Sequence, residues 1–168
     1  MIATFETTAG NFKIKLFNDK TPNMVAHFAS LANGTKEWTD PKTRESVKKP
    51  FYDGIIFHRV IPNFMVQFGC PLGNGTGGPG YNVNDEYHLE LKHNKKGLLS
   101  SANIGRPNTN GSQWFITVAP TPWLDGKHSI IGEVTEGYDI VEKISLAPTS
   151  MGDRPVQEIK ITSVKITE

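Results

Sequence analysis

Three runs of the chain combine polar or charged side chains with aromatic and other apolar residues. The first run extends from Phe57 to Gln67 and contains Arg59; the second covers residues 102–116 and the third covers residues 123–128. Taken alone, Arg59 is typical of an exposed charge, and the aromatic residues are typical of core packing. Their concentration favours another interpretation, because an apolar pocket with a few fixed polar groups is the general form of a small-ligand site.

Other kinds of catalytic site have little support. The five histidines show no recognised metal-ligand spacing and the single cysteine, Cys70, cannot complete a site, so no metal is expected. Residues 73–78 match G-x-G-x-x-G, but Pro79 and Gly80 follow in place of a helix, which favours a structural turn over a dinucleotide site. Asp85–Glu86 would point to opposite faces of an extended chain, which favours a solvated loop over acid–base chemistry. No G-x-S-x-G elbow of a hydrolase is present.

The elements that must position these groups are mostly short strands. Alternation of apolar and polar residues predicts an N-terminal hairpin over residues 2–16, with its turn at residues 9–11. One clear helix follows, with Thr21 as its cap, Pro22 at its first position and Gly34 at its end. Further strands are predicted over residues 55–61, 65–69, 98–102, 114–118, 129–134 and 159–166, the last with a bulge or bend, and a short second helix over 138–144. Such a pattern indicates an all-β sandwich or a closed barrel.

One long segment lacks useful periodicity. Residues 35–50 are charged, and we predict a surface loop there, with Trp38 packed onto the body of the protein. The chain of 168 residues has no linker and no internal repeat, so a single domain over 1–168 is expected.

Charge and cysteine content narrow the partners and the compartment. With 18 basic and 17 acidic residues, a net charge of +1 and no basic run, neither a nucleic-acid nor a membrane partner is expected. The N-terminus lacks the basic start and apolar run of a signal peptide, and a lone cysteine fits a reducing compartment. We therefore expect a cytoplasmic location.

The three segments resemble the signature blocks of the cyclophilin family, in the same order and within a match over nearly the whole chain. The resemblance implies a mainly β fold, a closed eight-stranded antiparallel β-barrel capped by two α-helices, with a groove on its outer surface. It implies peptidyl-prolyl cis–trans isomerase activity without a cofactor, on proline-containing peptides and unfolded proteins, assisting protein folding. It also implies a monomer and cyclosporin binding, since Trp123 occupies the family position that favours that ligand.

Site residues follow from the same resemblance. The implied catalytic group consists of the catalytic arginine Arg59, its supporting amide Gln67 and the neighbouring His58. The residues implied to form the proline pocket and its borders are Phe64, Met65, Phe115, Leu124, His128 and Trp123. Those implied to hold the peptide backbone before the proline are Ala102, Asn103 and Gln113.

The reaction requires such a set of groups. An X–Pro bond isomerises slowly because resonance gives the C–N bond double-bond character and a barrier of about 20 kcal/mol. Twisting the bond localises the lone pair on the prolyl nitrogen, so a fixed guanidinium at Arg59 would bind the twisted state better than either planar isomer. A pocket that only binds proline would need no such donor. A proline-peptide binding or chaperone module with little catalytic role therefore remains the second interpretation.

Three residues depart from the family pattern. Phe68 replaces a glycine, and strand alternation predicts that its side chain faces away from Gln67. Cys70 replaces a common aspartate, and Arg106 is a one-residue insertion beside the predicted groove.

Overall fold

The computed structural model describes residues 1–168, and most of its regular structure is β. The main sheet contains β1 (Ile2–Thr7), β2 (Gly10–Leu16), β5 (Phe57–Ile61), β6 (Met65–Phe68), β7 (Leu98–Ser101), β8 (Trp114–Thr117), β9 (Ile130–Glu136) and β12 (Ile161–Thr167). Two short hairpins pair β3 (Trp38–Thr39) with β4 (Ser46–Val47), and β10 (Thr149–Ser150) with β11 (Arg154–Pro155). The helices are α1 (Pro22–Asn33), α2 (Tyr138–Ser145) and the 3₁₀ helix Pro122–Leu124.

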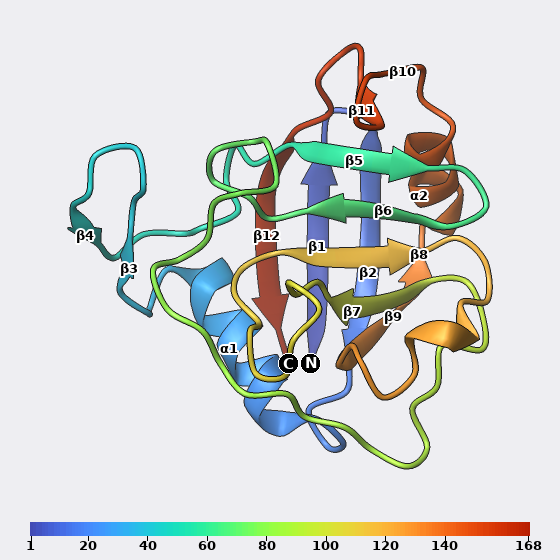
Figure 1. The fold of residues 1–168 in the computed structure, drawn as a ribbon, viewed down its shortest axis with the longest axis horizontal. Coiled ribbons are helices and arrows are strands. Elements are labelled where there is room, and N and C mark those ends of the chain that lie inside the picture. The colour runs from blue at the N-terminus through green and yellow to red at the C-terminus, as the bar shows by residue number, and fades with distance from the viewer.

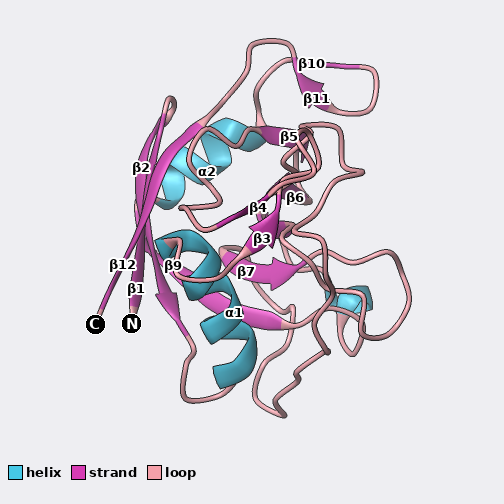
Figure 2. Ribbon diagram, turned by 90° about the vertical axis from the view of Figure 1, so that its left-hand side faces the viewer, coloured by secondary structure: helices cyan, strands magenta, loops and turns pink.

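The eight main strands form one curled antiparallel sheet in the order β12-β1-β2-β9-β7-β8-β6-β5. Figure 1 shows β5, β6 and β8 crossing in front of β1, β2 and β12, so the sheet folds over onto itself. Helix α1 lies at the lower left of that view and α2 at the upper right, while the two chain ends lie side by side. The β3–β4 hairpin projects from the body, and Figure 2 shows β12, β1 and β2 together along one side.

The expected closed barrel is found only in a coarser form, as an open half-barrel. Strands β12 and β5 lie at the two ends of the sheet order and share no ladder. Between them lies a single bridge that joins Ile56 to Lys160. Two backbone bonds flank that bridge: the N–H of Phe57 donates to the Ile159 carbonyl at 3.0 Å and the N–H of Ile161 to the Ile55 carbonyl at 2.8 Å.

Helix α1 begins at Pro22 and ends before Gly34, as predicted, and Gly34 adopts a left-handed φ of 76°. Thr21 occupies the N-cap position, as predicted, but the expected side-chain cap is wrong, because its hydroxyl makes no capping bond and instead donates to the Ile130 carbonyl at 3.1 Å. Glu86 takes that place from a distant loop: its carboxylate accepts the Met24 N–H at 2.9 Å. Glu86 was predicted to lie in a solvated loop, but its carboxylate instead contacts the N-terminal, positive end of α1.

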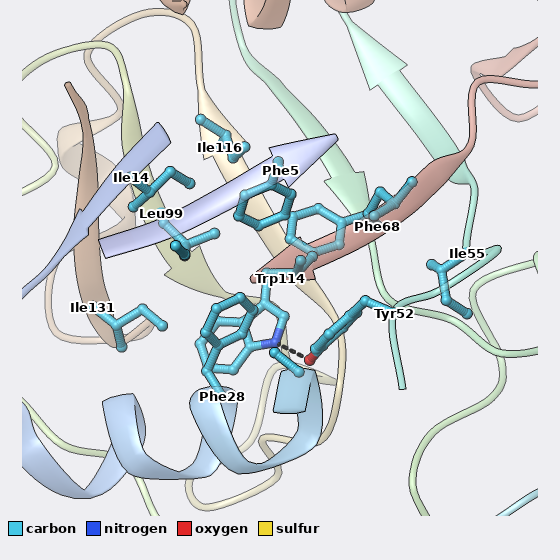
Figure 3. Close-up of a cluster of buried hydrophobic side chains, with 14 of the residues drawn as sticks. Phe5, Ile14, Phe28, Tyr52, Ile55, Phe68, Leu99, Trp114, Ile116 and Ile131 are labelled. Atoms are coloured by element: carbon cyan, nitrogen blue, oxygen red, sulfur yellow. Dashed lines mark hydrogen bonds between the residues drawn. The ribbon is translucent and has the colours of Figure 1, made fainter. Parts of the chain in front are cut away.

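The core lies between the folded-over halves of the sheet and α1. It contains 27 buried residues, and Figure 3 shows Trp114 packed among Phe28, Phe68 and Phe5. Trp114 also donates its indole N–H to the Tyr52 hydroxyl at 2.7 Å. Since Trp114 lies between Gln113 and Phe115, packing of this one side chain fixes the strand that carries two predicted site residues.

Local departures have simple causes. The segment over 35–50 is not only loop, because β3 and β4 pair within it, and Trp38 is buried against Phe51 as a packing residue. The predicted irregularity in the last strand is present as a register shift, in which Glu6 pairs with Ser163 but Thr7 pairs with Ile161.

Candidate active site

A row of side chains crosses three neighbouring strands on the outer face of the sheet. Arg59 on β5 pairs with Gln67 on β6, and Gln67 pairs with Phe115 on β8. The alternate residues Val66 and Phe68 belong to the core, so strand alternation turns Gln67 outward and Phe68 inward, as predicted. The ladder thus aligns a cation, an amide and an aromatic ring, although about fifty residues of sequence separate β6 from β8.

The side-chain amides of Gln67 and Gln113 connect Arg59 to a glycine-rich loop through a chain of hydrogen bonds. Arg59 Nη1 donates to Gln67 Oε1 at 3.5 Å, and Gln67 Nε2 donates to Gln113 Oε1 at 3.0 Å. Gln113 Nε2 then donates to the carbonyls of Gly75 and Gly77, both at 2.9 Å. Each amide is held by its neighbour, so the orientation of the oxygen beside Arg59 is fixed.

Apolar side chains gather beside the same row. Met65 and Phe115 are only 2% and 5% exposed, yet neither belongs to the main core cluster. The Phe115 ring meets the His128 ring edge to face at 5.5 Å, and Phe64 lies 6.1 Å from Trp123. Leu124 ends the 3₁₀ helix that presents Trp123, which remains 60% exposed.

His128 and Asn103 are both held by backbone carbonyls. His128 Nδ1 donates to the Ser101 carbonyl at 2.8 Å, which leaves Nε2 free. The Asn103 amide donates to the Lys127 carbonyl at 2.9 Å. These bonds tie the 102–103 segment to the loop that carries His128.

A polar hollow of about 430 Å³ adjoins the amide chain. Of the predicted residues, those that line it are Gln67, Ala102, Asn103 and Gln113. The apolar set of Phe64, Met65, Phe115, Leu124 and His128 lies outside its lining. The structure therefore separates the predicted set into a polar hollow and an apolar patch, with the Gln67–Gln113 pair as one wall of the hollow.

One network went unrecognised in the sequence. His93 Nδ1 donates to the Asp125 carboxylate at 2.8 Å, and His93 Nε2 lies 2.9 Å from Ser100 Oγ. These are the contacts of a Ser–His–Asp triad, but Ser100 is fully buried and no substrate carbonyl can reach its oxygen. Burial lowers the pKa of His93 more than Asp125 raises it, so the ring is neutral. It stacks on Phe115 at 6.2 Å, and the network therefore supports the apolar patch from beneath.

His58 is buried beside Arg59, and its Nδ1 atom has no hydrogen-bond partner. Burial lowers the pKa of His58 to about 4, with further contributions from the charges of Arg59 and Arg154. The ring is therefore neutral at physiological pH and presents no second charge to the groove.

No group of three metal-ligating side chains lies together in the structure. The glycine-rich residues 73–78 form a loop that no helix follows, as predicted for a structural turn. None of the helices is both long enough and apolar enough to span a membrane.

Comparisons with known proteins agree with this geometry. The family model described as cyclophilin type peptidyl-prolyl cis-trans isomerase/CLD matches residues 2–166. The chain is 48% identical over 169 residues to peptidyl-prolyl cis-trans isomerase B of Streptomyces anulatus, covering 99% of this chain and 96% of that protein. It is 48% identical over 167 residues to peptidyl-prolyl cis-trans isomerase A of Mycobacterium tuberculosis, covering 98% and 91%.

A solved structure matches the fold over the whole chain. It is a Cryptosporidium parvum cyclophilin type peptidyl-prolyl cis-trans isomerase, crystallised in the presence of the dipeptide Ala-Pro, with a TM-score of 0.87 and 31% identity. The match covers 100% of this chain and 99% of the other. Fold, family model and relatives together define a class of enzyme that catalyses cis–trans isomerisation of X–Pro peptide bonds. The chain belongs to the cyclophilin-type peptidyl-prolyl cis–trans isomerases.

Proposed function

We propose that Arg59 is the catalytic group of this isomerase and acts by stabilising the twisted X–Pro amide. Its guanidinium is exposed on the outer face, where a peptide has access to it, and Gln67 Oε1 orients it. Twisting concentrates the lone pair on the prolyl nitrogen, and a donor fixed beside that nitrogen gains strength only in the transition state. Arginine suits this role because it carries several donors in one plane and stays charged.

The remaining site residues are proposed to hold the substrate while the bond turns. The apolar set of Phe64, Met65, Phe115 and Leu124, with His128 at its edge and Trp123 at its border, would take the proline ring. Ala102, Asn103 and Gln113 would bind the backbone before the proline, and His58 would pack beside Arg59. The dipeptide in the Cryptosporidium parvum crystals, Ala-Pro, supports proline-containing peptides and unfolded proteins as substrates of this chain.

The observation that carries the assignment is the Arg59–Gln67–Gln113 chain, because it orients a guanidinium without neutralising it. NMR exchange on a short X-Pro peptide should show that Arg59→Ala lowers kcat/KM by about 10²- to 10³-fold, the cost of one preorganised donor. Arg59→Lys should remain well below wild type, since lysine lacks the planar fork. Full activity of Arg59→Ala would refute the assignment, and intact peptide binding in that variant would show that only catalysis was lost.

Cyclosporin binding is proposed on the exposed Trp123 beside Phe64, a flat apolar border for a large apolar ligand. One domain over 1–168 is proposed because the family model spans residues 2–166, and a monomer is proposed on the family resemblance alone. Sedimentation of the purified protein at several concentrations would test the monomer. A cytoplasmic location is proposed on the single, unpaired Cys70, and cell fractionation would test it.

Closure of the barrel is also a proposal. The bonds from Phe57 and Ile161 across the gap between β5 and β12 support it. Hydrogen exchange should protect both amides as strongly as those inside the β1–β2 ladder, whereas rapid exchange of both would indicate an open edge.

A further inference from the structure

The loop after β6 is closed on itself by a sulfur atom. Cys70 is 1% exposed, and its Sγ accepts the N–H groups of Gly75 and Gly77, both at 3.2 Å. The carbonyls of the same two glycines accept both bonds from Gln113 Nε2. Gly75 and Gly77 thus donate their N–H groups to the Cys70 sulfur, and their carbonyl oxygens accept from Gln113. The position of the sulfur therefore determines where those two carbonyls lie.

The thiol donates its S–H to Asn74 Oδ1 at 3.8 Å, and the sulfur also acts as an acceptor for the two glycine N–H groups. Burial by itself raises the pKa of Cys70, and backbone N–H groups of the loop, those of Gly77, Asn74, Gly75 and Leu72, outweigh it and lower the pKa overall. Donors that converge on one sulfur stabilise its electron-rich form. The loop is therefore organised around an acceptor, in the position where the family commonly has an aspartate.

The donor and acceptor ends of the Gln113 and Gln67 amides link the position of the loop to the orientation of Arg59. A primary amide has one acceptor end and one donor end, so Gln113 can offer its oxygen to Gln67 only while its NH₂ group is held elsewhere. The Gly75 and Gly77 carbonyls hold it. If they move away, both amides can flip, and Gln67 would then turn its NH₂ group toward the guanidinium of Arg59, donor against donor.

We propose that Cys70 is a positioning residue for the isomerase reaction, acting through the Gly75–Gly77 carbonyls, Gln113 and Gln67 on Arg59. The inference rests on the proposed catalytic role of Arg59. Cys70 does not touch substrate. Its contribution is the orientation of the amide chain, so its loss should reduce turnover and leave the apolar patch intact.

Four substitutions separate the acceptor from the volume of the side chain. Cys70→Ala and Cys70→Val both remove the acceptor, and the second keeps most of the volume. Cys70→Ser and Cys70→Asp keep an oxygen acceptor. Misplacement of a catalytic group by about 1 Å can cost up to about 10²-fold, so we expect kcat to fall roughly 10-fold or more in the Ala and Val variants, with a smaller rise in KM because Gln113 would also bind the substrate backbone. The Asp variant should recover most of the activity.

Controls distinguish positioning from general damage. Leu89→Ala, a change at a 91% exposed apolar side chain outside this loop, should retain wild-type activity. In ¹⁵N spectra the side-chain NH₂ signals of Gln67 and Gln113 should shift in Cys70→Ala and return in Cys70→Asp. If Cys70→Ala does not fold, Cys70→Val, which also lacks the acceptor but keeps most of the volume, gives the same comparison of kcat, KM and amide signals.

A double-mutant cycle decides the route of the effect. In an Arg59→Ala background, Cys70→Ala should cost little further activity. An equal loss in both backgrounds, or wild-type kcat in Cys70→Ala alone, would overturn the positioning role while leaving Arg59 as catalyst. Full activity of Arg59→Ala would refute the proposed function itself, so the two failures are distinguishable.

Discussion

The hydroxyl of Tyr52 clamps the strand that carries Gln113, and its removal should destabilise the protein. Tyr52 is fully buried; its hydroxyl donates to the Ser112 carbonyl at 3.0 Å and accepts the Trp114 indole N–H at 2.7 Å. Tyr52→Phe leaves one buried donor and one buried acceptor without a protein partner. Each such group costs about 1–3 kcal/mol, so we expect the free energy of unfolding to fall by about 2–4 kcal/mol.

Tyr138 provides a matched control, because its hydroxyl is buried without any partner. Tyr138→Phe removes an unpaired polar atom and should leave stability unchanged or raise it slightly. For a chain of this size Tm changes by about 2–4 °C per kcal/mol, so Tyr52→Phe should melt about 5–15 °C below wild type.

Urea unfolding followed by circular dichroism would measure both variants, with an unchanged m value showing that the compactness of the unfolded state is the same. A difference below about 0.5 kcal/mol between the two variants would refute the reasoning, because it would mean that the Tyr52 bonds contribute no more than an unpaired hydroxyl.

Three further predictions concern the helix cap, acid stability and ligand binding. Glu86→Ala removes the carboxylate that accepts the Met24 N–H and should cost about 1–2 kcal/mol in urea unfolding, whereas Glu90→Ala, which loses only an exposed ion pair, should cost under about 0.5 kcal/mol. Burial lowers the pKa of His58 from 6.5 to about 4, so the unfolded chain takes up a proton first and stability is lost as pH falls from 6.5 toward 4. His58→Asn should lose less stability than wild type between pH 7.5 and pH 5, and equal losses would contradict the burial argument. Calorimetry should detect cyclosporin binding, with Trp123→Ala weaker by roughly 30-fold for a loss of about 2 kcal/mol; no binding at micromolar protein would contradict the proposal.

The two wrong predictions have different physical causes. Thr21 and Pro22 have the local pattern of a capped helix start, yet the capping carboxylate comes from Glu86, 62 residues away along the chain. The segment over 35–50 has no strand periodicity because β3 and β4 contain only two residues each. The cap depends on a partner far along the chain, whereas two-residue strands are too short to show an alternating pattern although they pair within the same segment.

The sequence by itself determined the two α-helices, the eight strands of the main sheet and the faces of those strands. Alternation along β6 places Gln67 outward and Phe68 in the core, and the resemblance of three ordered segments identified the family. Tertiary structure alone decided which way each amide points, because Arg59 and Gln67 lie on two strands, Gln113 lies just before a third, and the glycine carbonyls belong to a loop. Hydrogen-bond direction depends on the partner at each end, and those partners meet only when the sheet curls. The role inferred for Cys70 therefore emerges from the fold, whereas the sequence marked that residue only as a departure from the family pattern.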